Sequence, residues 1–133
     1  MFSVGVSDFC MVAHSLADPT FGPAQRLHGA TYTVEVEVHS TALGGHHVVM
    51  DLGALRTIVR GAIAPIDYSN LDDHPAFQGR ISTTERLSVY LADVIADAIA
   101  GLPEDARPVE PAYLRVRLRE SPNAWAGCQR PIP

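Results

Sequence analysis

Two histidines, His14 and His28, stand at the ends of two segments in which apolar residues alternate with polar ones. Each histidine belongs to the apolar side of its segment, so two antiparallel strands would bring both imidazoles to one end of a sheet. Imidazole is a common zinc ligand and also a group that holds or moves protons near neutral pH. The spacing therefore predicts either part of a metal site or a polar pocket held by hydrogen bonds.

A third candidate, Glu120, follows a segment, 113–119, whose apolar residues alternate with three arginines. Glu120 continues the apolar side of that alternation, so we expect it to face the same side as the histidines. A carboxylate that faces inward is costly unless it is paired. Among the residues of this chain, Glu120 is the strongest sign of a bound ligand. The arginines on the other side are expected to meet Glu35 and Glu37 across the sheet or a subunit seam, and a role in binding phosphate is the less favoured alternative.

The elements that position these residues begin with two long strands. Residues 2–14 and 28–40 alternate over their whole length, which predicts two strands that each bury one face. The connection contains Asp18-Pro19 and Gly22-Pro23, so we expect an irregular and functional loop. The tail, 123–133, can add a strand fragment to that of 113–119.

Two helices are expected between the strand pairs. Apolar residues recur at helical spacing over 52–63, after Asp51 as N-cap, and Pro65 ends this helix. After a polar loop over 66–81, the second helix begins at 82–85, where Ser82 and Glu85 fit a capping box, and closes at Gly101.

This order, ββααβ(β), predicts one α+β domain over 1–133, with two helices on one face of a four-stranded antiparallel sheet. The exposed edges of such a sheet are expected to pair with other subunits.

The net charge is −5 without a basic stripe, which argues against a nucleic-acid partner. No apolar run approaches the ~20 residues that span a bilayer, and no signal peptide is expected. We therefore expect a cytoplasmic protein without a membrane partner.

The segments Ala13-His14-Ser15-Leu16 and Leu27-His28-Gly29 resemble the zinc-binding segments of the 6-pyruvoyl-tetrahydropterin synthase / 6-carboxytetrahydropterin synthase family, F-x-A-A-H-x-L and L-H-G-H-x-Y. The resemblance extends to Asp67, to Thr83-x-Glu85 and to Glu120, in the same order along the chain. It implies a tunnelling fold, ββααββ, whose copies assemble as a trimer or hexamer into a barrel with sites at subunit interfaces. It also implies a zinc ion held by His14 and His28.

Three functional groups of the family are replaced here. Ala30 stands where the family has its second zinc histidine, so the missing ligand would have to come from the same face or a neighbouring subunit. The segment 21–26 lacks the family's cysteine, and Cys10 is expected to be core. Tyr68 stands where the family has a histidine after Asp67. The resemblance then implies that Asp67 and Tyr68 move protons.

The resemblance implies a substrate as well, namely a reduced pterin such as 7,8-dihydroneopterin triphosphate or a related heterocycle. Glu120 would hold the ring, because a carboxylate accepts two adjacent N–H donors of a 2-amino-4-oxo pyrimidine. Thr83 and Glu85 would assist, although both can instead cap the second helix. We expect a lyase with altered chemistry. The alternative is a pterin- or purine-binding tunnelling-fold protein without catalysis.

Overall fold

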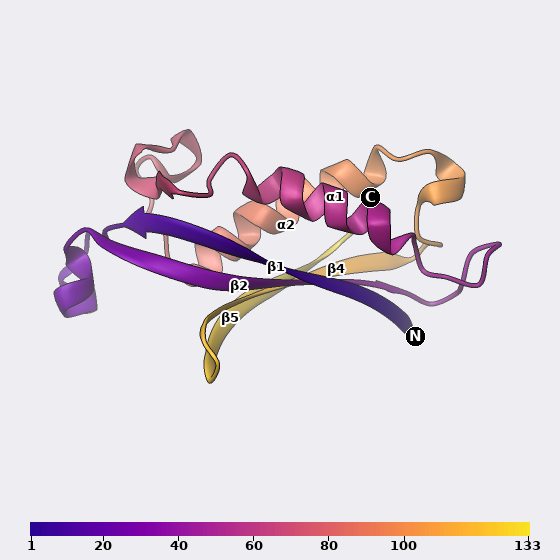
Figure 1. Ribbon diagram of the computed structural model, residues 1–133, viewed down its shortest axis with the longest axis horizontal. Coiled ribbons are helices and arrows are strands. Elements are labelled where there is room, and N and C mark those ends of the chain that lie inside the picture. The colour runs from indigo at the N-terminus through magenta and orange to yellow at the C-terminus, as the bar shows by residue number, and fades with distance from the viewer.

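The computed structural model describes all residues, 1–133, and contains one five-stranded sheet with two long helices on one of its faces (Figure 1). The strand order is β3-β1-β2-β4-β5. All long strands pair antiparallel, and the short β3 runs parallel to β1. The strands are β1 (Phe2–His14), β2 (His28–Ser40), β3 (Ser69–Asn70), β4 (Ala112–Ser121) and β5 (Ala124–Pro131).

The helices are α1 (Leu52–Ile63) and α2 (Thr84–Ala100). Asp51 caps α1, because its side chain accepts a hydrogen bond from the backbone N–H of Ala54. Four 3-10 turns lie in the connections: η1 (Pro19–Gln25), η2 (Leu71–Asp73), η3 (Pro75–Phe77) and η4 (Glu104–Ala106). No helix is both long enough and apolar enough to span a membrane.

The hydrophobic core lies between the sheet and the two helices. A single cluster of 27 buried residues fills this layer. Val34 and Val36 of β2 are fully buried there, and Leu55 of α1 and Leu91 of α2 pack from the other side. Alternation in the central strands thus separates one apolar face from one polar face. The predicted α+β architecture, with both helices on one face, is confirmed.

The sequence prediction needs three corrections in the sheet and its connections. The sheet has five strands rather than four, because residues 69–70 add a short edge strand. The tail forms a full strand, β5, instead of a fragment. The connection after β1 is not wholly irregular, since η1 covers part of it and bends at Gly22, whose φ is 53°.

The start of α2 also differs from the predicted capping box. Thr83 is the N-cap, and its hydroxyl accepts a hydrogen bond from the backbone N–H of Arg86. With Thr83 as the N-cap, Glu85 is one position too early to complete a capping box. Ser82 is buried and bonds to His14 instead. The capping alternative for Thr83 is confirmed, and that for Glu85 is wrong.

Two strand edges remain without a partner in the chain. β3 pairs with Val12 and Ala13 of β1, and Asp67 and Tyr68 bond to the backbone of Met11, so the outer edge of β1 is free over residues 2–10. β5 is the last strand on the other side of the sheet. Free edges of this length offer backbone N–H and C=O groups to another strand.

Candidate functional site

His14 and His28 are direct partners at the end of the β1–β2 pairing. Their ring centroids lie 4.6 Å apart, and the ring planes meet at 61°. Both side chains lie on the helix-facing side, as the alternation predicts, and His14 is only 3% exposed. The expected convergence of the two imidazoles is therefore present within one chain.

Hydrogen bonds fix which ring nitrogen carries the proton. Nδ1 of His14 lies 3.0 Å from the backbone oxygen of Ser82, and Nδ1 of His28 lies 2.8 Å from that of Arg26. A carbonyl oxygen only accepts, so each Nδ1 donates a hydrogen. In the neutral ring, each Nε2 then keeps its lone pair. No fully buried side-chain nitrogen or oxygen lacks a partner, so the unbonded Nε2 of His14 has access to the cavity.

Burial lowers the pKa of His14 below its usual value, and the neighbouring His28 lowers it further. A buried imidazolium would lose hydration and would lie beside a second imidazole that can also be charged. His14 is thus neutral at neutral pH. A neutral imidazole can accept a proton or a hydrogen bond from a ligand.

The two histidines open onto a cavity of about 590 Å³ between the end of the sheet and the start of α2. This volume is within the range of sites for small molecules. The lining comes from β1, β2, β4, η1 and the beginning of α2. It comprises His14, Leu16, Phe21, Ala24, His28, Gly29, Ala30, Thr31, Tyr32, Thr83, Thr84, Glu85 and Glu120.

Glu120 lines this cavity together with both histidines, on the side that the alternation predicts. It is nevertheless exposed, so the expectation of an inward, buried carboxylate is wrong for the single chain. The side chain lies at the open mouth of the cavity, where no salt bridge or hydrogen bond engages it within the chain. Its oxygens are therefore available to a ligand.

Thr83 and Glu85 also line the cavity, from the first turn of α2. The hydroxyl of Thr83 accepts from a backbone N–H, so capping occupies one of its lone pairs. Glu85 is exposed. Two carboxylates thus lie at the opening of a cavity whose inner end holds two imidazoles.

Tyr32 is a lining residue that the sequence interpretation did not select. It is 2% exposed, and its hydroxyl lies 3.4 Å from Oγ1 of Thr84. Burial raises the pKa of Tyr32, and the negative charge of Glu120 adds to this effect. The phenol therefore keeps its proton and can donate it as a hydrogen bond into the cavity. A signal was available, since Tyr32 shares its strand face with His28.

Asp67 and Tyr68 do not line the cavity. Asp67 accepts from the backbone N–H of Met11 at 2.9 Å and forms an ion pair with Arg60 at 2.9 Å. Tyr68 has a left-handed φ of 56°, and the residue is 81% exposed. Both residues lie beside the free edge of β1. Within one chain they are separate from the histidines.

Cys10 is part of the core, as expected, and is fully buried. Burial raises the pKa of its thiol to about 12, and the charge of Asp67 contributes in the same direction. A thiolate is the nucleophilic form of cysteine. Cys10 is therefore unsuited to act as a nucleophile.

The donors of one chain do not complete a catalytic zinc site. No group of three or more histidine, cysteine, aspartate or glutamate side chains is placed to hold a metal ion. A catalytic zinc usually takes three protein ligands. His14 and His28 supply two, and Ala30 lies at the next position of β2 on the same face.

Comparison with known proteins adds family evidence to this geometry. The chain matches the family model described as 6-pyruvoyl tetrahydropterin synthase over residues 4–131. The 6-pyruvoyl tetrahydrobiopterin synthase of Poecilia reticulata is 41% identical over 83 residues, which are 60% of this chain and 56% of the relative. The 6-carboxy-5,6,7,8-tetrahydropterin synthase of Bacillus subtilis is 28% identical over 116 residues, 85% of this chain and 75% of the relative.

The match spans little more than half the length of the first of these relatives. Among solved structures, a 6-pyruvoyl tetrahydropterin synthase from Caenorhabditis elegans superposes with a TM-score of 0.78 at 19% identity, covering 97% of this chain and 95% of that one. This similarity confirms the tunnelling fold. Because the family model covers nearly the whole chain, the protein belongs to the 6-pyruvoyl tetrahydropterin synthase family.

Proposed function

We propose that this protein binds a reduced pterin, or a closely related heterocycle, and acts on it as a lyase with altered chemistry. The observation that carries the proposal is the cavity of about 590 Å³ that unites Glu120 with His14 and His28. Relatives of the chain include a 6-pyruvoyl tetrahydrobiopterin synthase and a 6-carboxy-5,6,7,8-tetrahydropterin synthase. Their names support a pterin as the substrate class.

In this proposal, Glu120 holds the heterocycle. A 2-amino-4-oxo pyrimidine edge presents two adjacent N–H groups, and a carboxylate can accept both in parallel. Glu120 suits this role because nothing in the chain occupies its oxygens. Glu85 and Thr83 would assist at the same opening.

The imidazoles would face the other end of the heterocycle. The neutral His14, with its Nδ1 held by Ser82, offers Nε2 as a proton acceptor. Tyr32 offers the opposite function, because its phenol remains protonated and can donate. A proton acceptor and a proton donor in one cavity are what moving a proton beside a carbonyl requires.

Zinc is part of the expectation for this family, but the two imidazoles do not complete a site for it. If zinc is bound, it would polarise a substrate oxygen as a Lewis acid, and its remaining ligand would come from another subunit or from solvent. The steps proposed above use the protein side chains alone.

A neighbouring copy would bring in the remaining candidates. Asp67 and Tyr68 lie beside the free edge of β1, and β5 has the other free edge. Copies joined edge to edge, as a trimer or hexamer, would place this pair next to another copy's sheet. Light scattering coupled to size exclusion measures that assembly.

The second candidate function is binding without catalysis. The observations that favour it are the buried Cys10 thiol, with a pKa of about 12, and the separation of Asp67 and Tyr68 from the cavity. Under this alternative the same heterocycle binds, and no bond is broken.

The experiment is a binding titration of reduced pterins and purines, followed by product analysis with 7,8-dihydroneopterin triphosphate. We expect saturable pterin binding that Glu120→Gln weakens about tenfold or more, since a hydrogen bond to a charged group is lost. Glu104→Gln is the matched control, because Glu104 is exposed in η4, away from the cavity.

Product formation by the native protein would establish the lyase, and binding without product would establish the second candidate. The cavity assignment fails if no heterocycle binds, or if the Glu120 and Glu104 variants bind equally well.

A further inference from the structure

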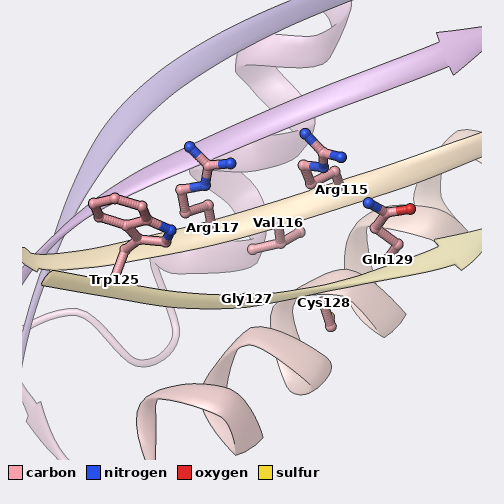
Figure 2. A pocket seen from close by; sticks show the side chains of 7 residues that line it. All are labelled: Arg115, Val116, Arg117, Trp125, Gly127, Cys128 and Gln129. Atoms are coloured by element: carbon pink, nitrogen blue, oxygen red, sulfur yellow. The ribbon is translucent and has the colours of Figure 1, made fainter.

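The face of the sheet without helices carries a notch of about 240 Å³ between β4 and β5. Figure 2 shows Arg115 and Arg117 projecting from β4, with Trp125 at one end of the notch and Gln129 at the other. Gly127 lies between these two on β5. This notch is on the opposite face of the sheet from the cavity with the histidines.

The notch exists because Gly127 has no side chain. Trp125, Gly127 and Gln129 alternate along β5 and share one face. A Cβ at Gly127 would lie 2.2 Å from the backbone oxygen of Val116, which is closer than atoms can approach. The position therefore requires glycine, and the gap in the row of side chains is a fixed feature of the β4–β5 pairing.

Arg117 has unused hydrogen-bond donors beside this gap. Its guanidinium forms no hydrogen bond in the chain, and its nearest carboxylate oxygen is Oε2 of Glu35, at 3.9 Å. The other oxygen of Glu35 accepts from Nε of Arg119. Glu35 is thus hydrogen-bonded to Arg119, whereas its interaction with Arg117 is a long ion pair without a hydrogen bond.

The guanidinium of Arg115 also lies at long range from a carboxylate, but it is held in place by a further partner. Its Nη1 lies 3.6 Å from Oε2 of Glu37, and the same oxygen is 3.0 Å from Nε2 of His39. In the amide orientation that satisfies both groups, Gln129 accepts from Nε of Arg115 at 3.1 Å and from Nη2 at 2.7 Å. Gln129 therefore holds the guanidinium of Arg115 at one end of the notch.

Trp125 holds the other end. The guanidinium carbons of Arg119 and Arg117 lie 4.6 Å and 5.5 Å from the centroid of its ring. Stacking of this kind orients a guanidinium while leaving its edge N–H groups free. The indole N–H of Trp125 also has no partner in the chain. The notch is thus bordered by oriented donors and has few acceptors.

The charged side chains around the notch also favour an anion, because positive charges outnumber negative ones. The ion pairs of this surface join three arginines, at positions 115, 117 and 119, to two glutamates, at positions 35 and 37. One positive charge is therefore in excess, although the chain as a whole has a net charge of −5. The side chains of Arg115 and Arg117 are only 35% and 32% exposed, so water screens them incompletely.

We propose that this notch binds a small phosphate-type oxyanion through Arg117, with Arg115 and Trp125 as further donors. The fork of an arginine matches two oxygens of phosphate, and the volume admits one phosphate group. Two sources share this chemistry, free inorganic phosphate and the phosphate of a small monoester. The proposal is independent of the pterin site, since its residues lie on the other face.

The test is calorimetric titration of the native protein with inorganic phosphate at constant ionic strength, without any pterin. We expect saturable binding with one site per chain. Arg117→Gln should weaken it about tenfold or more, because charge-assisted hydrogen bonds are lost. Arg130→Gln is the matched control, since Arg130 lies on the neighbouring strand β5 but pairs with Asp93 of α2, away from the notch.

Arg117→Lys provides a second variant that keeps the charge, and we expect intermediate affinity because lysine lacks the fork. Circular dichroism of each variant verifies the fold. A parallel titration with methyl phosphate identifies the source: equal affinity indicates a monoester, and binding of inorganic phosphate alone indicates the free ion. The proposal is overturned if the native protein shows no saturable binding, or if the Arg117 variants bind as tightly as Arg130→Gln.

Discussion

His14 and His28 face each other across β1 and β2, and their imidazoles meet with centroids 4.6 Å apart. The contact follows from strand register, because the two residues face each other as the last pair of a thirteen-residue ladder. Each ring is then held by a backbone carbonyl through Nδ1. The inner end of the cavity is therefore built by the sheet and the connections on either side of it.

The zinc site can be completed by one substitution. Ala30→His places a third imidazole two residues after His28, on the same face of β2. We expect this variant to retain about one zinc per chain after dialysis, because three imidazoles form a usual catalytic zinc site. The native protein should retain less. Atomic emission measures the metal content.

Thr33→His is the control for this experiment, because Thr33 lies on the other face of β2 and does not line the cavity of His14 and His28. Equal zinc retention by the Thr33 and Ala30 variants would contradict the geometric argument. One zinc per chain in the native protein would show that a ligand comes from elsewhere.

The stability of the protein should depend on the protonation of His14. Burial lowers the pKa of this residue in the folded state, below about 6.5 for an unfolded chain. The neutral ring is favoured by folding, so the stabilisation is present above that pH and is lost as the pH falls below it. We expect the free energy of unfolding to decrease between about pH 7.5 and 5.5, measured with urea in the presence of a chelator.

His14→Gln should reduce this dependence, whereas His46→Gln should preserve it, since His46 is exposed. The interpretation is wrong if the native protein and His14→Gln lose stability in parallel as the pH falls.

Asp67 should contribute to stability whatever its part in catalysis. Asp67→Ala removes the acceptor of the Met11 backbone N–H and the partner of Arg60. The side chain of Asp67 is only 18% exposed, so we expect a loss of about 2 kcal/mol in the free energy of unfolding. Urea denaturation measures it, with Asp73→Ala as an exposed control. A loss no larger than that of the control would show that these bonds contribute nothing.

Two glycine-to-alanine substitutions should have opposite effects. At Gly127 the new methyl would strike the backbone oxygen of Val116, so we expect Gly127→Ala to destabilise the protein by about 2 kcal/mol. Gly61 lies in α1, where the new Cβ would meet no atom within 4 Å apart from the backbone of its own helix. There, alanine should stabilise the helix by about 0.5–1 kcal/mol. Thermal unfolding compares the two, and a shift of the same sign for both would contradict the steric argument.

The long strands could be predicted from sequence because their alternation persists over many residues. Residues 2–14 and 28–40 form β1 and β2 with the expected bounds and faces. β3 could not be predicted, since two residues carry no periodicity. The start of α2 was misplaced by one residue, because the buried contact between Ser82 and His14 is tertiary and leaves no local pattern.

In the candidate site, too, strand alternation predicts some features and tertiary contacts determine the rest. Alternation along β4 predicts the side of the sheet to which Glu120 belongs, and the cavity confirms it. Alternation does not show whether a helix or loop covers the end of β4, and the exposure of Glu120 therefore cannot be predicted from it. Tyr32 was missed for a different reason. Its position suits both the core and the cavity, and only the neighbouring Thr84 shows that its hydroxyl reaches a polar partner.

Because the β1–β2 ladder pairs His14 with His28, the geometry of the two rings does not depend on the length of the segment that connects the strands. Residues added to or removed from the connection between β1 and β2 leave the ladder, and hence the imidazole contact, in place. A single residue deleted inside either strand would instead turn one ring to the arginine-bearing surface, because side chains alternate. Variation in length among natural or designed versions should therefore concentrate in the segment 15–27.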